Sequence, residues 1–189
     1  MNWKMIFNPF VKFDDRHLLL TGMLFFVLNV FGCHYAGNVN DSIFHYSLPD
    51  ADQGLEEILK INSLSYIIAI AVLFLLGKLL NGKTRLIDIA NTVLISQIPL
   101  IITIPFTGLP FFRKATESIT LNTQHPENLP IPYVVLVSIW GLVSLIFLIY
   151  SITLLYNGFR TATNIKKWQH IVVFAAVSLF IIMLSQAIL

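Results

Sequence analysis

Residues 79–106 read LLNGKTRLIDIANTVLISQIPLIITIPF, a short basic turn followed by a long apolar run. The pair Asn81-Gly82 is typical of a helix end and a turn, and Thr84 is of a residue type that caps the start of a helix. The run that follows has about the 20 residues needed to cross roughly 30 Å of hydrocarbon. This stretch therefore predicts two membrane-spanning helices joined by a tight hairpin.

Other apolar stretches of similar length occur along the chain. Of the 189 residues, 56% are hydrophobic and only 12% are charged, and the mean hydropathy is +0.76. A soluble domain of this size could not bury so much apolar surface. A net charge of +2 is too small to indicate a nucleic-acid partner. We predict an all-α bundle of five transmembrane helices, at about 18–36, 62–80, 86–106, 131–156 and 169–189.

Positive charge falls almost entirely in every other connector. Nine of the 12 Lys and Arg residues lie on one side of the predicted bundle. Basic residues near span ends stay cytoplasmic, so the N-terminus is predicted inside and the C-terminus outside. Anionic lipid headgroups are the expected partners of these basic residues. Those predicted to face lipid are Lys4, Lys12, Lys83, Arg85, Arg160, Lys166 and Lys167.

Residues 1–13 are too short to span a membrane and unusually aromatic. Their aromatic rings alternate with lysines, which is the pattern of a segment lying in the headgroup layer. Pro9 prevents one continuous helix there. Asp14 or Asp15 is then expected to cap the first spanning helix, where a carboxylate also meets the positive end of the helix dipole.

The outer connectors differ in composition. Residues 37–60 are acidic, and Leu55, Ile58 and Leu59 recur at helical spacing, so the second helix is predicted to begin before the membrane. Residues 107–130 are rich in proline and are expected to form a structured outer loop rather than a separate domain.

The third span contains Pro99 and Pro105. Each proline lacks a backbone N–H and clashes with the preceding turn, so the helix should bend at or just before Pro99. In hydrocarbon the freed carbonyl of Ile95 needs another donor. We therefore predict that this helix is central and packs against at least two others. The candidate donors are Gln97 and Asn91 on the same helix, and Asn29 and Gln186 on neighbouring helices.

Polar residues inside the predicted spans are the places to look for a site. The candidates are Asn91, Gln97, Pro99, Asp88 and Asn29. Each has two interpretations. Asp88 is either a carboxylate that stabilises the helix start or a proton or cation ligand at the cytoplasmic mouth. The side-chain amides either hold helices together, at on the order of 1 kcal/mol per bond, or line a substrate path.

No catalytic or metal-binding motif is present in the sequence. His34, His45 and His125 fall on the predicted outer side without close ligand spacing, which leaves open whether they meet. Cys33 is the only cysteine and is expected to be a small apolar packing residue. We expect no enzyme activity, no cofactor and no metal.

Three stretches together resemble one family. Phe7-Asn8-Pro9 precedes the first span, residues 86–100 read LIDIANTVLISQIPL, and Trp140 is followed by LLYNGFRTA at 154–162. These resemble the aromatic-Asn-Pro element, the proline-containing third helix and the basic exit of the fourth helix in the Yip1 domain family, specifically its short stand-alone bacterial type.

The resemblance implies a single transmembrane domain over residues 1–189 whose fifth helix ends outside. It also implies a multi-pass protein of the bacterial cytoplasmic (inner) membrane. The long cytosolic tail rich in Pro, Gln and Tyr that eukaryotic members carry is missing here. Vesicle trafficking linked to Rab GTPases is therefore not expected.

Two classes of function are compatible with these residues. The first is a non-enzymatic scaffold or accessory factor that organises lipids or partner membrane proteins, acting with a partner or as a homo-oligomer. The second is a small permease or lipid flippase or scramblase with its site at the broken third helix, because broken helices line transport sites near the membrane midplane. A membrane enzyme that uses the outer histidines is a weaker third alternative and would need a metal.

Overall fold

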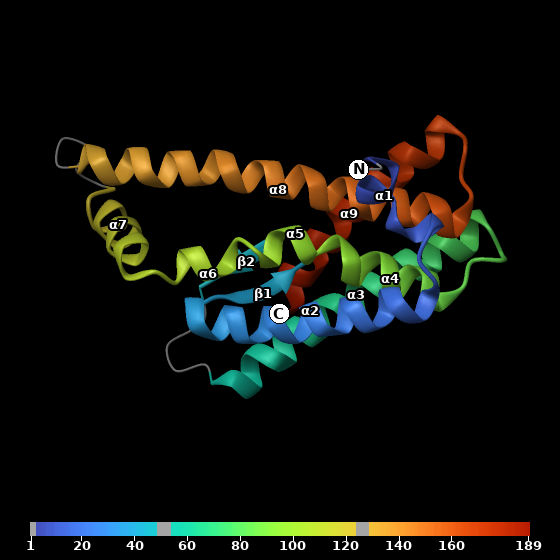
Figure 1. Ribbon diagram of the computed structural model, residues 1–189, viewed down its shortest axis with the longest axis horizontal. Coiled ribbons are helices and arrows are strands. Elements are labelled where there is room, and N and C mark those ends of the chain that lie inside the picture. The colour runs from blue at the N-terminus through green and yellow to red at the C-terminus, as the bar shows by residue number, and fades with distance from the viewer. Residues whose placement is uncertain (1–2, 49–53, 124–128) are drawn as a thin grey trace.

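The computed structural model describes residues 3–48, 54–123 and 129–189. These residues form a bundle of long helices with one small β-hairpin (Figure 1). The strands are β1 (Val39–Ser42) and β2 (His45–Ser47). The helices are α1 (Trp3–Phe7), the 3₁₀ turn η1 (Pro9–Val11), α2 (Asp15–Ala36), α3 (Leu55–Leu80), α4 (Leu86–Ser96), α5 (Ile98–Ile101), α6 (Ile104–Thr107), α7 (Pro110–Leu121), α8 (Ile131–Thr163) and α9 (Trp168–Ile188).

Five stretches are long and apolar enough to cross a membrane: α2, α3, the combined run Leu86–Thr107, α8 and α9. The predicted polytopic helical bundle is thereby confirmed. α3 begins at Leu55, ahead of the apolar run predicted from residue 62, and carries Glu56 and Glu57 in its first turn. α8 continues to Thr163, past the predicted limit at residue 156, because its last turns pack at the end of the bundle.

The third span occupies the centre, as predicted. In its most apolar window 72% of the residues are buried inside the protein, whereas no other span exceeds 33%. α4 packs against α2, α3 and α8, and α5 packs against α2 and α8. Figure 1 shows α4, α5 and α6 running between α2 and α8 along the length of the molecule.

The same span is interrupted rather than continuous. α4 ends at Ser96, with Gln97 as its C-cap, and α5 then starts at Ile98. Pro99 and Pro105 each lie in the first turn of a new helical segment, α5 and α6 respectively. A proline is tolerated there because the first turn of a helix has no intrahelical partner for that N–H.

The predicted side-chain donors for the carbonyl of Ile95 are wrong. Among the described residues the Gln97 side chain donates to Ser96 Oγ, and the Asn91 and Asn29 amides donate to other residues. The backbone N–H of Gln97 turns back towards the carbonyls of Leu94 and Ile95 instead. Gln186 is exposed on α9. The backbone tightens locally at the break, where the Gln97 N–H donates to the carbonyl of Leu94 three residues earlier (3.4 Å).

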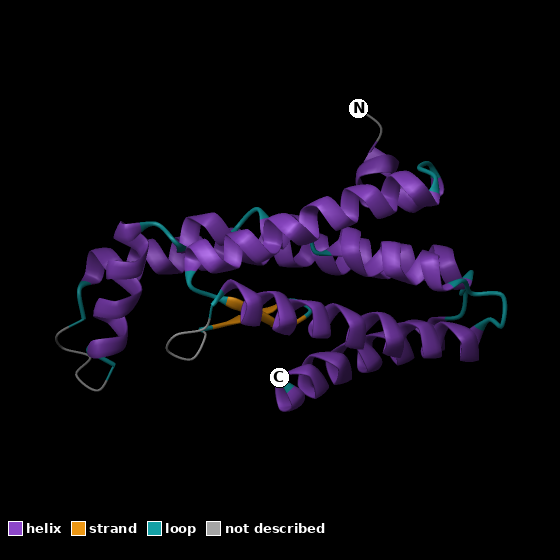
Figure 2. Ribbon diagram, turned by 90° about the horizontal axis from the view of Figure 1, so that it is seen from below, coloured by secondary structure: helices purple, strands orange, loops and turns teal. Residues whose placement is uncertain are grey.

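The β-hairpin is the main element that the sequence did not predict. β1 and β2 pair antiparallel, with Ser42 opposite His45, and Figure 2 shows the hairpin lying among the helices. β1 packs against α3 and α9, and its neighbour Ile43 is fully buried in the core cluster that includes Tyr66 and Ile181. The hairpin is thus held by tertiary packing within the bundle.

Two predicted helix caps differ in the structure. The N-cap of α4 is Arg85 rather than Thr84. The Thr84 hydroxyl instead donates to the carbonyls of Gly77 and Asn81, which ties the α3–α4 connector to the end of α3. Asp14 occupies the N-cap position of α2 without a side-chain cap bond, because its carboxylate pairs with His17 one turn along.

The connector 107–130 contains α7, a helix with one apolar face. Phe112 and Ala115 are buried on that face, and the ring of Phe106 stacks on Trp140 with centroids 3.7 Å apart. α7 packs against α8. The predicted structured loop is therefore an amphipathic helix that closes one end of the molecule.

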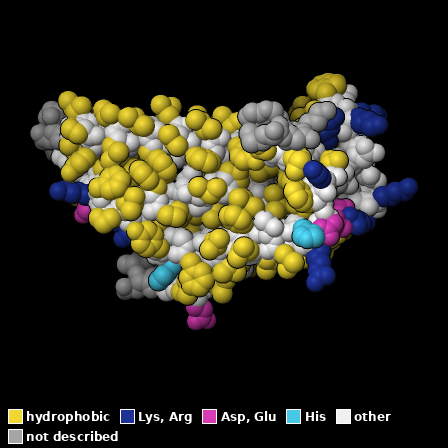
Figure 3. Space-filling view, in the orientation of Figure 1, with side chains coloured by type: hydrophobic (Ala, Val, Ile, Leu, Met, Phe, Trp, Pro, Cys, Tyr) yellow, Lys and Arg dark blue, Asp and Glu magenta, His cyan; other side chains and the backbone are white. Residues whose placement is uncertain are grey.

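The two ends of the bundle differ in charge. We call the end formed by residues 8–17, 77–88 and 157–170 the basic end, because it carries most of the described Lys and Arg residues. We call the opposite end, with β1, β2 and α7, the hairpin end. Figure 3 shows basic and acidic side chains gathered mainly at the two ends and an apolar surface between them.

Candidate functional site

The N-terminal segment lies against the last turns of α8 at the basic end. The Asn157 side chain donates to the carbonyl of Phe7 (2.7 Å), and the Tyr150 hydroxyl donates to the carbonyl of Ile6 (2.9 Å). Carbonyls at the end of a short helix lack intrahelical partners, so these side chains satisfy them. The segment predicted to lie in the headgroup layer is thus fixed to the bundle by α8.

Arg85 holds two carboxylates together at this end. Its guanidinium contacts Asp88 through two bonds, at 3.0 Å and 2.5 Å, and reaches Asp15 of α2 at 2.9 Å. The hydrogen bonds and charge of Asp88, with the charge of Asp15, raise the pKa of Arg85 above its ordinary value. Asp88, predicted either to stabilise the helix start or to bind a cation, is therefore an ion-pair partner that joins the start of α4 to the connector.

A cavity of about 160 Å³ lies beside this cluster. Its wall comes from four segments that are distant in sequence: η1, the start of α2, the first turns of α4 and the last turns of α8. The lining residues are Phe10, Asp15, Leu18, Arg85, Asp88, Asn91, Thr92, Gly158, Thr161 and Ala162.

Asn91 and Thr92 are the most deeply buried polar residues that line this cavity, and each is only 1% exposed. The Asn91 Nδ2 donates to the backbone carbonyl of Asp15 (3.1 Å), which fixes the orientation of the amide because the reverse would place two acceptors together. Its Oδ1 has no hydrogen-bond partner among the described residues. The Asn91 amide, predicted either to hold helices together or to line a substrate path, thus joins α4 to α2 and has one acceptor without a partner among the described residues.

Close packing of α4 on α8 shapes the cavity wall. A Cβ added at Gly158 would lie 2.6 Å from the Thr92 hydroxyl and 2.8 Å from the ring of Phe10. Glycine is therefore required for α8, α4 and η1 to meet here. The Thr92 hydroxyl donates to the carbonyl of Asp88 (2.7 Å), so its oxygen can still accept a hydrogen bond.

A second hollow, of about 290 Å³, adjoins the cavity and shares Thr161 with it. It carries two basic side chains, Arg160 and Lys166, and neither forms an ion pair among the described residues. Both were predicted to face lipid headgroups. The remaining lining residues are Asn8, Asn157, Asn164 and Ile165.

The other predicted site residues lie elsewhere. Gln97 is fully buried at the end of α4, and its Oε1 has no partner among the described residues. Pro99 is buried in α5. Asn29 joins a separate group, in which its Nδ2 donates to the Tyr66 hydroxyl (3.3 Å) and its Oδ1 accepts from Tyr46 (3.3 Å). The structure therefore brings Asn91 and Asp88 together and separates them from Gln97, Pro99 and Asn29.

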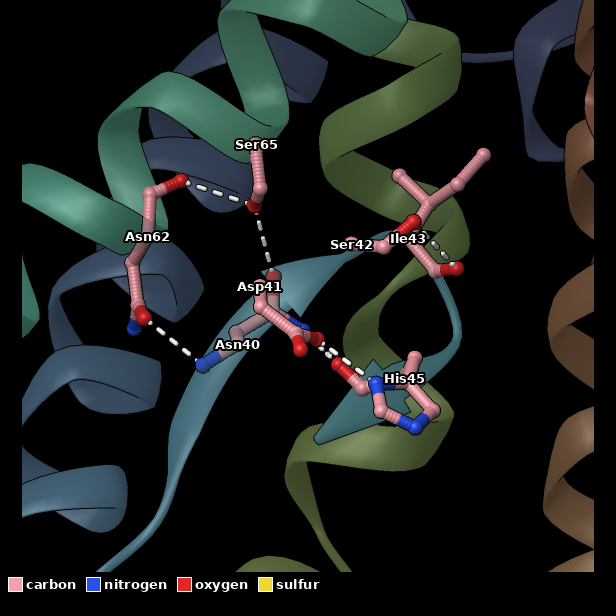
Figure 4. A network of polar contacts seen from close by, with 7 residues as sticks. All are labelled: Asn40, Asp41, Ser42, Ile43, His45, Asn62 and Ser65. Carbon is pink, nitrogen blue, oxygen red and sulfur yellow. Dashed lines mark hydrogen bonds and ion pairs between the residues drawn. The ribbon is translucent and has the colours of Figure 1, made fainter. Parts of the chain in front are cut away.

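A second buried polar cluster, which was not predicted from the sequence, holds the β-hairpin to α3 (Figure 4). Asn62 Oδ1 accepts the backbone N–H of Asn40 (2.9 Å), and the Ser65 hydroxyl donates to Asn40 Oδ1 (2.9 Å). All three residues are fully buried. Asn62 and Ser65 are spaced three apart on one face of α3, which is the only signal that could have indicated a shared polar partner.

The histidines do not assemble a metal site among the described residues. His45 pairs with Asp41 (2.7 Å) on the hairpin, while His34 is exposed at the end of α2. His125 lies outside the described residues. No group of three or more metal-ligating side chains occurs within the described parts of the chain.

Comparison with known proteins identifies one family. The model of the Yip1 domain matches residues 3–189, nearly the whole chain. Neither the curated proteins nor the solved structures include a match to the chain.

Proposed function

Because the chain belongs to the Yip1 domain family of multi-pass membrane proteins, we propose that it is a non-enzymatic scaffold or accessory factor of the membrane. In this role it organises lipids or partner membrane proteins, including further copies of itself. We also propose that residues 1–189 act as one domain, with the basic end in the cytoplasm and the C-terminus outside. If the bacterial resemblance holds, the host membrane is the cytoplasmic (inner) membrane.

The observation that carries this proposal is the exposure of α8. In its most apolar window only 6% of the residues are buried inside the protein. Ile139, Leu142 and Ile146 are each more than half exposed, and nothing lies within 4 Å of a Cβ placed at Gly141. The face of α8 that carries these residues is free of contacts with its own chain, so it presents its surface to lipid or to another helix, and glycine lets a second helix approach closely.

Photocrosslinking along α8 tests the scaffold. A photoreactive residue at position 139, 142 or 146 in native membranes should give adducts of discrete mass. Matched positions 179 and 183 on α9, whose residues are also exposed, should give fewer adducts or none. A protein that is strictly monomeric, with only lipid adducts at every position, would contradict the proposed partner or homo-oligomer.

The second candidate function, a permease or lipid flippase, is favoured by one observation. The third span is interrupted at Gln97, and the Oε1 of this buried side chain lacks a partner among the described residues. Interrupted helices with free polar groups are found at transport sites. Reconstitution into liposomes with a lipid-scrambling assay separates the two functions. Under transport, Gln97→Leu lowers flux and Pro99→Ala abolishes it without loss of expression, whereas a scaffold tolerates Pro99→Ala.

Thiol labelling of intact cells tests the proposed orientation. In a Cys33→Ser background, a cysteine at 83 or 164 should be protected from an impermeant reagent added outside, and one at 122 should react. The reverse pattern would place the basic end outside, contrary to the asymmetry of positive charge.

A further inference from the structure

The cavity at the basic end has an excess of negative charge. Asp15 and Asp88 share a single guanidinium, that of Arg85, so one negative charge is left over. No other Lys or Arg side chain lines the cavity. A ligand with one positive charge would balance this cluster.

The uncharged groups of the cavity favour the same kind of ligand. Asn91 Oδ1 is a buried acceptor without a partner among the described residues, and the Thr92 oxygen can still accept. A buried acceptor is costly to leave unpaired, so the site favours a cation that carries N–H donors. A primary ammonium has three such donors.

The size of the cavity argues against a bare metal ion. A single water needs only about 10–15 Å³ of such space, and this cavity has about 160 Å³. The described residues contain no group of three metal-ligating side chains here or elsewhere. The space suits a small organic cation.

The neighbouring hollow suits a phosphate. It shares Thr161 with the cavity and carries Arg160 and Lys166 without acidic partners among the described residues. The side-chain N–H groups of Arg and Lys bind phosphate through charge-assisted hydrogen bonds. An acidic cavity beside a basic hollow matches a zwitterion in which an ammonium and a phosphate are close neighbours.

An apolar groove of about 330 Å³ lies between α8 and Ile6 and Phe7 of the N-terminal segment. It ends at Thr153, one helical turn from Asn157 of the basic hollow, or about 6 Å along the axis. The groove is lined by Ile6, Phe7, Ile146, Phe147, Ile149, Tyr150 and Thr153. An acyl chain attached to the phosphate would lie in this groove.

We propose that the basic end binds the phosphoethanolamine headgroup of a phospholipid. The ammonium lies in the Asp15–Asp88–Asn91 cavity, the phosphate contacts Arg160 and Lys166, and one acyl chain follows the groove along α8. This proposal specifies the lipid that the proposed scaffold binds. It rests on the proposed function in one respect, namely that the basic end contacts a lipid leaflet.

Lipid retention by the full-length protein tests the proposal. The detergent-purified protein is incubated with dioleoyl phosphatidylethanolamine, phosphatidylcholine or phosphatidylglycerol, and bound lipid is counted by native mass spectrometry. We expect at least tenfold more phosphatidylethanolamine than phosphatidylcholine to be retained, because N-methylation removes the N–H donors and enlarges the head. Equal retention of the two would overturn the proposal.

Variants locate the two halves of the site. Asp15→Asn, which keeps the shape of a partly exposed side chain, and Asn91→Leu should each abolish the preference for phosphatidylethanolamine. Arg160→Gln with Lys166→Gln should reduce retention of both zwitterionic lipids alike. Asn122→Leu, at the hairpin end, is the matched control and should leave the retention of each lipid unchanged. An unchanged preference in Asp15→Asn would show that the ammonium does not bind in this cavity.

Soluble phosphoethanolamine identifies the source of the ligand. It should compete with the lipid only at concentrations at least 100-fold above that of the lipid, because it lacks the acyl chain. Competition at equal concentration would overturn the assignment to a lipid. A wild-type protein that shows no lipid preference but forms the α8 crosslinks would overturn this site alone, and a wild-type protein that keeps the preference but forms no crosslinks would overturn the scaffold alone.

Discussion

Replacing Ile43 with alanine should release the β-hairpin from the bundle. Ile43 is fully buried at the hairpin turn, within the core cluster that contains Tyr66 and Ile181. If the hairpin undocks into water, this side chain loses its burial, which is worth the full hydrophobic value of about 1.5–3 kcal/mol. Truncation also leaves a cavity, and Ile→Ala changes in cores cost about 2–5 kcal/mol.

The native cysteine reports this release. Cys33 is fully buried in a core cluster with Val39 of β1, and its carbonyl accepts the N–H of Asn38 (2.9 Å). The Cys33 Sγ and the Tyr46 hydroxyl of β2 both donate to Asn29 Oδ1 on α2. Alkylation of Cys33 by a small maleimide therefore requires the hairpin to open. A loss of about 2 kcal/mol makes the open state about 30-fold more populated and speeds alkylation by the same factor.

The control is Ile67→Ala, which truncates the same residue type on the exposed face of α3. It should leave the alkylation rate of Cys33 within about twofold of the wild-type rate, because little packing is lost. Should Ile43→Ala react no faster than the wild type, the hairpin would not be what covers Cys33. Equal acceleration by Ile67→Ala would show a general loosening of the bundle instead.

Three further predictions concern single contacts. Gly158→Ala should lower stability by about 1–3 kcal/mol through overpacking, seen as a lower thermal midpoint, whereas Gly141→Ala, with open space around it, should not. Asn62→Ala should cost about 1–3 kcal/mol and speed Cys33 alkylation, because it leaves a buried backbone N–H of β1 unpaired. The hydrogen bond from His17 lowers the pKa of Asp14 from its ordinary value of 3.8. The stability that this pair gives the folded protein is therefore present above pH 3.8 and is lost as the pH falls through the lowered pKa. His17→Ala should raise the pKa of Asp14 in an NMR titration; an unchanged value would show that the pair does not form.

The central position of the third span could be predicted because polar groups in hydrocarbon need hydrogen-bond partners from neighbouring protein. Pro99 and the amide of Asn91 both require neighbouring protein, and the structure buries them against α2 and α8. The partner that satisfies Asn91 could not be predicted. It is a backbone carbonyl 76 residues away in sequence, at Asp15, and no periodicity encodes such a pairing.

The hairpin escaped prediction for a different reason. Its two-residue turn is Ile43-Phe44, and Phe44 has a φ of 69°, a conformation that usually calls for glycine or asparagine. Local sequence therefore argues against a turn at this place. Burial of Ile43 and the hydrogen bond that the Asn40 backbone N–H donates to Asn62 outweigh that local cost, so the decisive interactions are tertiary.

The two ends of the bundle use their polar groups differently. At the hairpin end the buried Asn40 is bonded to both Asn62 and Ser65, so non-helical backbone is held inside the bundle by partners from α3, and only the Nδ2 donor of Asn62 lacks a partner within this group. At the basic end, Asn91 Oδ1 and one negative charge stay without a partner from the described chain. Hydrogen bonds made within the chain stabilise one fixed arrangement, whereas unused acceptors gain free energy only from something that enters. The hairpin end is therefore held by bonds within the chain, and phosphoethanolamine binding at the proposed basic-end site is expected to raise the stability of the folded protein.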